Sequence, residues 1–65
     1  MKILLNGEAF ATDAKTLDEL CARLGFAEAK IATALNGTFV AAIQRSTTKL
    51  ASADEIEIVA PRQGG

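Results

Sequence analysis

The group in this chain with the clearest chemistry is the carboxyl group at its end. The sequence closes on P-R-Q-G-G, so Gly64 and Gly65 place no side chain beside that carboxylate. A narrow channel in another protein can therefore admit this segment and bring reactive groups close to it. Because a terminal carboxyl group has a reference pKa of about 3.3 to 3.7, it is an anion and a poor acyl donor at neutral pH. Any acyl transfer from it requires activation by a partner.

Three side chains invite a chemical interpretation, and each has a simpler structural one. Cys21 lies on an apolar helical stripe, which predicts a buried core residue in place of a sulfur acceptor. Glu55 and Glu57 alternate with isoleucines in E-I-E-I-V-A, which predicts the solvated face of a strand in place of an acid-base pair. These residues are not predicted to react.

The residue types present exclude most enzyme classes. The chain has no histidine and a single cysteine, so the usual zinc sites, Cys-His pairs, Ser-His-Asp triads and internal disulfides cannot be assembled from it. We expect a protein that is not itself an enzyme and that holds no cofactor or metal.

Composition and charge limit which partners the protein can have and where in the cell it can be located. With 65 residues, 49% of them hydrophobic and 23% charged, the chain predicts one small globular domain that is a monomer when free. Its basic residues are scattered and the formal net charge is -1, which argues against nucleic acid. The opening M-K-I-L-L-N-G is too short in apolar residues for a signal peptide, and no run approaches membrane-spanning length. A cytoplasmic protein without a membrane role is expected.

The first half of the chain predicts a hairpin followed by a helix. Asn6-Gly7 between K-I-L-L and E-A-F-A indicates a hairpin over residues 2–12, since both turn positions need positive φ. Thr16-Leu17-Asp18-Glu19 fits a capping box in which Thr16 accepts from the Glu19 amide and the Glu19 carboxylate accepts from the Thr16 amide. The helix is predicted over residues 17–24, with Gly25 ending it in the left-handed conformation.

The second half predicts a second hairpin and a final strand. A polar bridge at residues 28–30 precedes a run that ends at Leu35, and Asn36-Gly37 joins this run to a short strand at residues 38–40. A-A-I-Q-R-S predicts a single helical turn, and residues 52–54 have turn chemistry. The last strand then runs from Glu55 to about Ala60. The expected architecture is α+β: a β-grasp (ubiquitin-like) domain over residues 1–60, with a mixed four- or five-stranded sheet and one main helix. A flexible tail is expected over residues 61–65.

The order of these motifs resembles a known family. The N-G hairpin, the single helix, A-L-N-G, the strand D-E-I-E-I-V and the terminal Gly-Gly together resemble the small β-grasp sulfur-carrier proteins, most closely the carrier of thiamine thiazole synthesis. The resemblance spans the whole chain. One departure is Ala53-Asp54 before the last strand, where the family often has Gly-Asp, and it indicates a slightly different turn.

The resemblance implies a reaction at Gly65. A partner of the ubiquitin-activating type would use ATP and Mg²⁺ to convert its carboxylate to an acyl-adenylate. Sulfur from a donor such as a cysteine desulfurase persulfide would then displace AMP and leave a thiocarboxylate, and the sulfur would pass to a thiazole synthase. Gly64 would give access to the carboxyl group. Arg62 and Val59 are candidate partner contacts, and those of Phe10, Phe39 and Val59 that lie on the open sheet face would form an apolar patch for both partners.

Three other functions remain open at this point. The small subunit of molybdopterin synthase is also a β-grasp protein with a terminal thiocarboxylate, although its chains usually run longer. A ubiquitin-like modifier would instead be conjugated to target proteins through Gly65. A plain interaction module would have an inert tail.

Overall fold

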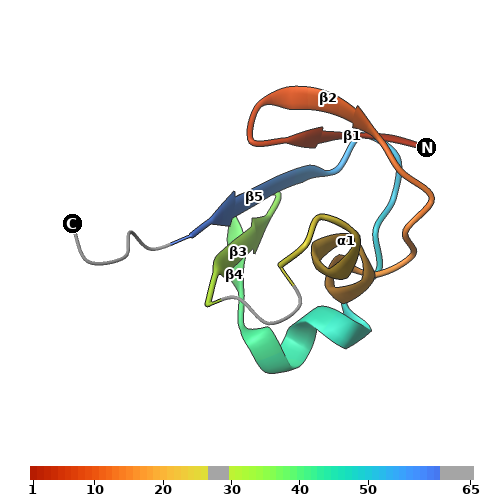
Figure 1. Cartoon of the computed structure of the whole chain (residues 1–65). Coiled ribbons are helices and arrows are strands. Elements are labelled where there is room, and N and C mark those ends of the chain that lie inside the picture. The colour runs from red at the N-terminus through yellow and green to blue at the C-terminus, as the bar shows by residue number, and fades with distance from the viewer. Residues whose placement is uncertain (27–29, 61–65) are drawn as a thin grey trace.

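The computed structural model describes residues 1–26 and 30–60 of the chain (Figure 1). Residues 28 and 29 of the expected polar bridge, and the whole expected tail, lie outside the described residues. The elements in chain order are β1 (Lys2–Leu5), β2 (Glu8–Ala11), α1 (Leu17–Arg23), β3 (Ala32–Leu35), β4 (Thr38–Val40), the 3₁₀ helix η1 (Ala42–Thr47) and β5 (Glu55–Val59).

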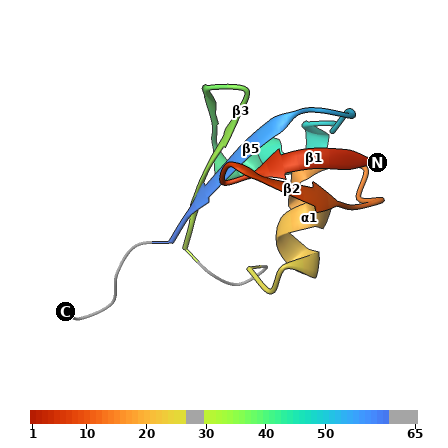
Figure 2. The same cartoon turned by 90° about the horizontal axis from the view of Figure 1, so that it is seen from above.

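The strands form one five-stranded sheet in the order β2-β1-β5-β3-β4. Strand β5 lies in the middle, parallel to β1 and antiparallel to β3, while β1-β2 and β3-β4 are antiparallel hairpins. Helix α1 lies against one face of the sheet, with η1 on the same side (Figure 1), and Figure 2 shows β5 running between the two hairpins. The α+β β-grasp prediction is confirmed, with five strands and with the last strand at the centre.

Both Asn-Gly turns have the predicted backbone. Asn6 and Asn36 each have φ of 51°, and Gly7 and Gly37 each have φ of 84°. Two consecutive residues with positive φ give the turn whose twist matches that of the flanking strands. The two hairpins are therefore confirmed, and their registers bring Leu5 opposite Glu8 and Leu35 opposite Thr38.

The start of α1 is confirmed in part. The Thr16 hydroxyl accepts from the Glu19 amide at 3.1 Å, as expected for an N-cap. The Glu19 carboxylate, however, accepts from the amide of Lys15 at 2.8 Å, so the predicted bond to the Thr16 amide was wrong by one residue. The carboxylate also accepts from Arg23, four residues later on the helix, at 2.6 Å. The helix ends at Arg23, with Leu24 as its C-cap and Gly25 at φ 89°.

The core lies between α1 and the sheet. Alternate strand residues point toward the helix, and the helix contributes the stripe predicted from its spacing. The buried residues are Ile3, Ala14, Leu17, Leu20, Cys21, Thr33, Val40, Ile56 and Ile58. The one polar member is satisfied, because the Thr33 hydroxyl donates to the Val40 carbonyl at 2.8 Å and accepts from the guanidinium of Arg45 at 3.0 Å. This arginine also donates to the Ile31 carbonyl at 2.7 Å, and so it fastens η1 to β3.

The connection between β4 and β5 is more ordered than the sequence indicated. The predicted single turn is the six-residue helix η1. Beyond it, the Leu17 amide donates to the Thr48 carbonyl and the Leu50 amide donates to the Lys15 carbonyl, which ties the connection to the start of α1. In the predicted turn at residues 52–54, Ala53 has φ of 71°. Positive φ strains an alanine, whereas a glycine adopts it without strain, so glycine would be the more stable residue at this position.

Candidate functional site

The C-terminal end of β5 is held in the middle of the sheet. Val59 lies opposite Ala32 of β3, and Ile58 lies opposite Thr33. This end of β5 projects from the side of the molecule opposite the N-terminus (Figure 1). The predicted site residues Gly65, Gly64 and Arg62 follow it in sequence but lie outside the described residues, so the structure places only Val59 among the predicted contacts.

The sheet face opposite α1 carries a small apolar surface beside that end. Val59 is 62% exposed and Phe39 is 68% exposed. The register pairs Val59 with Ala32 and Phe39 with Ala34, and the two alanines are two residues apart on β3, so all four side chains share one face. We call Ala32, Ala34, Phe39 and Val59 the open-face patch. Phe10, the other aromatic candidate, is half-buried and packs against the core instead.

Carboxylates border the open-face patch. Glu57 lies opposite Ala34, and Glu55 lies opposite Leu4 of β1, which is 37% exposed. Both glutamates are exposed, as predicted for a solvated strand face, and neither forms an ion pair within residues 1–26 and 30–60. They line a hollow of about 360 Å³ between the two Asn-Gly turns, together with Leu4, Gly7, Gly37 and Ile56. The face therefore offers a partner both apolar contact and negative charge.

Cys21 is a core residue, as predicted. Its side chain is 2% exposed. Burial raises the pKa of the thiol above its ordinary value, with Arg45 opposing the rise and Asp18 adding to it. A buried neutral thiol is a poor nucleophile, so Cys21 is no candidate for carrying sulfur.

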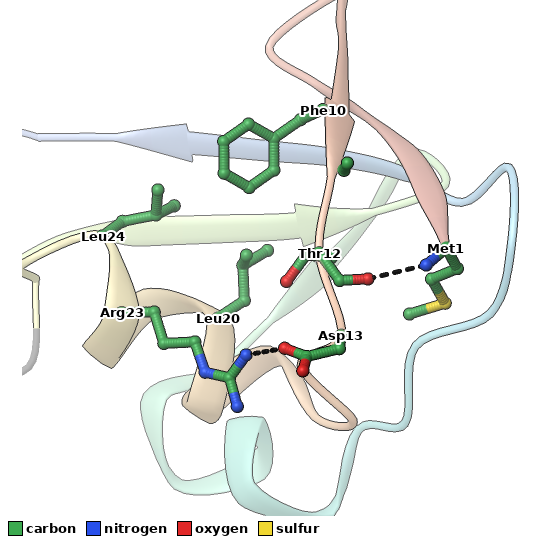
Figure 3. Close-up of a pocket in the computed structure, with 8 residues that line it drawn as sticks. Met1, Phe10, Thr12, Asp13, Leu20, Arg23 and Leu24 are labelled. Carbon is green, nitrogen blue, oxygen red and sulfur yellow. Dashed lines mark hydrogen bonds and ion pairs between the residues drawn. The ribbon is translucent and has the colours of Figure 1, made fainter.

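A separate hollow of about 440 Å³ lies between the end of β2 and α1, and Figure 3 shows its lining. Phe10, Leu20 and Leu24 give it apolar walls. Of its charged groups, Arg23 is paired with Asp13, which also lines the hollow, and with Glu19. The Met1 amino group donates to the Thr12 carbonyl at 2.9 Å at its edge. The ionisable groups that line it are thus paired or hydrogen-bonded, and none of its lining residues comes from β5.

The described part of the chain contains neither a cluster of metal ligands nor a membrane-spanning helix. Within residues 1–26 and 30–60, no three His, Cys, Asp or Glu side chains gather closely enough to hold a metal ion. None of the helices in the same ranges has the length and apolar composition needed to cross a bilayer.

Two residues near β5 were recognised from the sequence only as turn formers. The side-chain amides of Asn6 and Asn36 hydrogen-bond to β5, at Ile58 and Glu55 respectively. Asparagine is favoured in such turns for reasons local to the turn, so the sequence held no signal for these contacts with a distant strand. Ala32 and Ala34 were also missed, because their place beside Val59 and Phe39 follows from strand register.

A mixed five-stranded sheet on a single α-helix, with the last strand at its centre, defines a ubiquitin-like β-grasp protein. The model of the ThiS family matches residues 3–65, and the chain belongs to this family of small sulfur carriers, which are carrier proteins and not enzymes. The fold is also similar to a crystal structure of the thiamine biosynthesis protein ThiS from Geobacter metallireducens, with 28% identity, a TM-score of 0.79 and 100% of both chains covered. A comparison with curated protein sequences gave no significant match.

Proposed function

We propose that this protein carries sulfur for thiazole formation in thiamine biosynthesis as a thiocarboxylate on Gly65. The observation that carries the proposal is the family match, which extends through Gly65. The similarity to the Geobacter metallireducens thiamine biosynthesis protein over the full length of both chains supports the choice of pathway.

The proposed chemistry has three steps. The Gly65 carboxylate attacks the α-phosphorus of Mg²⁺-ATP in an adenylating partner of the ubiquitin-activating type, which forms an acyl-adenylate and releases pyrophosphate. The terminal sulfur of a persulfide, for example on a cysteine desulfurase, attacks the acyl carbon and expels AMP. A thiol then cleaves the resulting acyl disulfide at its S–S bond, which frees the thiocarboxylate and leaves a disulfide between the two thiol sulfurs. A thiazole synthase accepts the sulfur.

The described residues contribute docking to this scheme. The open-face patch includes Val59, which is at the C-terminal end of β5, and the neighbouring carboxylates Glu55 and Glu57 lie on the same strand. Five residues span at most about 16 Å when extended. A partner that docks on the open-face patch thus has Gly65 within reach of a recessed ATP site. Such a partner should present apolar groups flanked by basic ones, to match Phe39 and Val59 on one side and Glu55 and Glu57 on the other.

Residues 62, 64 and 65 have separate proposed roles. Gly64 and Gly65 let the backbone enter a narrow channel, because a side chain at either position would block close approach to the carboxyl group. Arg62 would contact an acidic or phosphate group of the adenylating partner. Because the first step consumes ATP, we place the protein in the cytoplasm.

Intact-mass spectrometry tests the proposed function. The purified protein is incubated with a thiamine-pathway adenylating enzyme, Mg²⁺-ATP, a cysteine desulfurase with cysteine, and a thiol reductant. The expected result is replacement of one oxygen by sulfur, dependent on ATP, and subsequent loss of that sulfur to thiazole synthase. Conjugates to other proteins would support a modifier instead. Sulfur transfer to molybdopterin synthase in preference to thiazole synthase would reassign the pathway. An unchanged mass with active partners would refute the proposal.

A further inference from the structure

Strand β1 ends before β5 does. Their parallel pairing covers Leu4 opposite Glu55 and Leu5 opposite Ile56. The Leu4 amide donates to the Asp54 carbonyl and the Asn6 amide donates to the Ile56 carbonyl, both at 2.9 Å. The chain then turns away toward β2, and the last residues of β5 continue past the end of β1.

The Asn6 side chain continues the interrupted ladder. Its Oδ1 accepts from the Ile58 amide at 2.9 Å, and its Nδ2 donates to the Ile58 carbonyl at 3.2 Å, across 52 residues of sequence. In a regular parallel ladder these two bonds come from the carbonyl of one residue and the amide of the residue two positions later. A carboxamide carries the same donor and acceptor as a peptide unit. Asn6 therefore supplies the acceptor and the donor that the turn removes from β1.

From this geometry we infer that Asn6 is a positioning residue for Gly65. Asn6 binds Ile58 from the β1 side, and β3 is paired with the next residue, Val59, on the other side, so Asn6 fixes the direction in which Val59 and Ala60 leave the sheet. This inference rests on the proposed function, because a fixed direction matters only if the carboxyl group of Gly65 must enter a partner's site. Restricting the approach of a reacting group raises the fraction of productive encounters after docking.

Asn36 provides a matched control. It has the same φ of 51°, precedes a glycine in the same kind of turn, and also binds β5 through its side chain. Its Oδ1 accepts from the Glu55 amide at 2.8 Å, and its Nδ2 donates to the Asp54 carboxylate at 3.1 Å. These contacts hold the start of β5, at the opposite end from Val59. Glycine is compatible with positive φ, so Asn6→Gly and Asn36→Gly remove the side-chain bonds and keep each turn.

Nuclear magnetic resonance tests the contact between Asn6 and Ile58 in the free protein, without any partner. In Asn6→Gly, hydrogen exchange at the Ile58 amide should accelerate about tenfold, the effect of losing about 1.4 kcal/mol of local protection, while the Glu55 amide is unaffected. In Asn36→Gly the pattern should reverse. Residual dipolar couplings of the Val59 and Ala60 amides should shrink in Asn6→Gly alone. Equal couplings in the two variants would overturn the inference, whatever any enzyme assay gives.

Kinetics with the adenylating enzyme tests the consequence. With the carrier as varied substrate and pyrophosphate release as readout, Asn6→Gly should lower kcat about fivefold and leave KM within about twofold, because docking is intact and orientation is lost. Asn36→Gly should change neither by more than about twofold. Equal kcat in the two variants would overturn the inference. An inactive wild-type chain would instead refute the proposed function, and the resonance measurements alone would then decide whether Asn6 orients the end of β5. Should Asn6→Gly not fold, Asn6→Asp against Asn36→Asp makes the same comparison, since aspartate keeps the acceptor and loses the donor.

Discussion

Truncating Phe39 should weaken docking more than it weakens the fold. The side chain is 68% exposed, and a phenylalanine buries roughly 150 to 250 Å² when fully covered, so about 130 Å² remains for a partner to bury. At about 25 cal/mol per Å² this area is worth at most about 3 kcal/mol. Because interfaces rarely cover a side chain completely, we expect Phe39→Ala to raise KM for the carrier about 10- to 100-fold.

Ile43→Ala is the control for that substitution. Ile43 is even more exposed, at 87%, but it lies on η1, on the same side of the sheet as α1 (Figure 1). Pyrophosphate release by the adenylating enzyme gives KM for each variant, and urea unfolding gives its stability. Phe39→Ala should cost about 1 kcal/mol of stability or less. If Ile43→Ala raises KM as much as Phe39→Ala does, or if neither raises it, then docking does not use the open-face patch.

Three further outcomes are expected. Ala53→Gly should raise the free energy of unfolding by about 0.5 to 1 kcal/mol in urea titrations, because φ of 71° strains an alanine; an unchanged midpoint would mean that the turn relaxes freely. Stability should fall as pH rises through and beyond 9.0, the ordinary pKa of Cys21, because the unfolded thiol ionises there while burial keeps the folded one protonated. Cys21→Ala should lack this component, so parallel pH curves for the two proteins would contradict it. Deleting Gly65 should leave the melting temperature unchanged and abolish sulfur transfer, and a deletion that unfolds the domain would show a structural role.

Local features of the fold followed from short stretches of sequence. The two Asn-Gly pairs predicted both hairpins, because positive φ at two adjacent positions is a demand that few residues meet. Thr16 and Gly25 marked the ends of α1 to within a residue, since each meets a backbone requirement at a helix end. The alternation around Ile56 and Ile58 predicted which face of the last strand is buried.

Features that depend on contacts distant in sequence did not follow. Nothing local to E-I-E-I-V specifies that it lies between β1 and β3, and the open-face patch depends on that placement. The Glu19 carboxylate accepts from the Lys15 amide with one oxygen and from Arg23 with the other, a pair of contacts that a four-residue motif does not encode. The Asn6 contact with Ile58 likewise required the register of two strands that are far apart in the chain.

The central position of β5 has a consequence for how the protein is made. Each hairpin can form from its own residues, but the two halves of the sheet meet only through the strand that is synthesised last. A ribosome-bound chain that lacks residues 55–59 therefore has no continuous sheet on which α1 can close the core. Folding that waits for such distant pairing is slow for a chain of this size. A chain interrupted before β5 would therefore lack both the finished sheet and the open-face patch, on which the proposed activation of Gly65 depends.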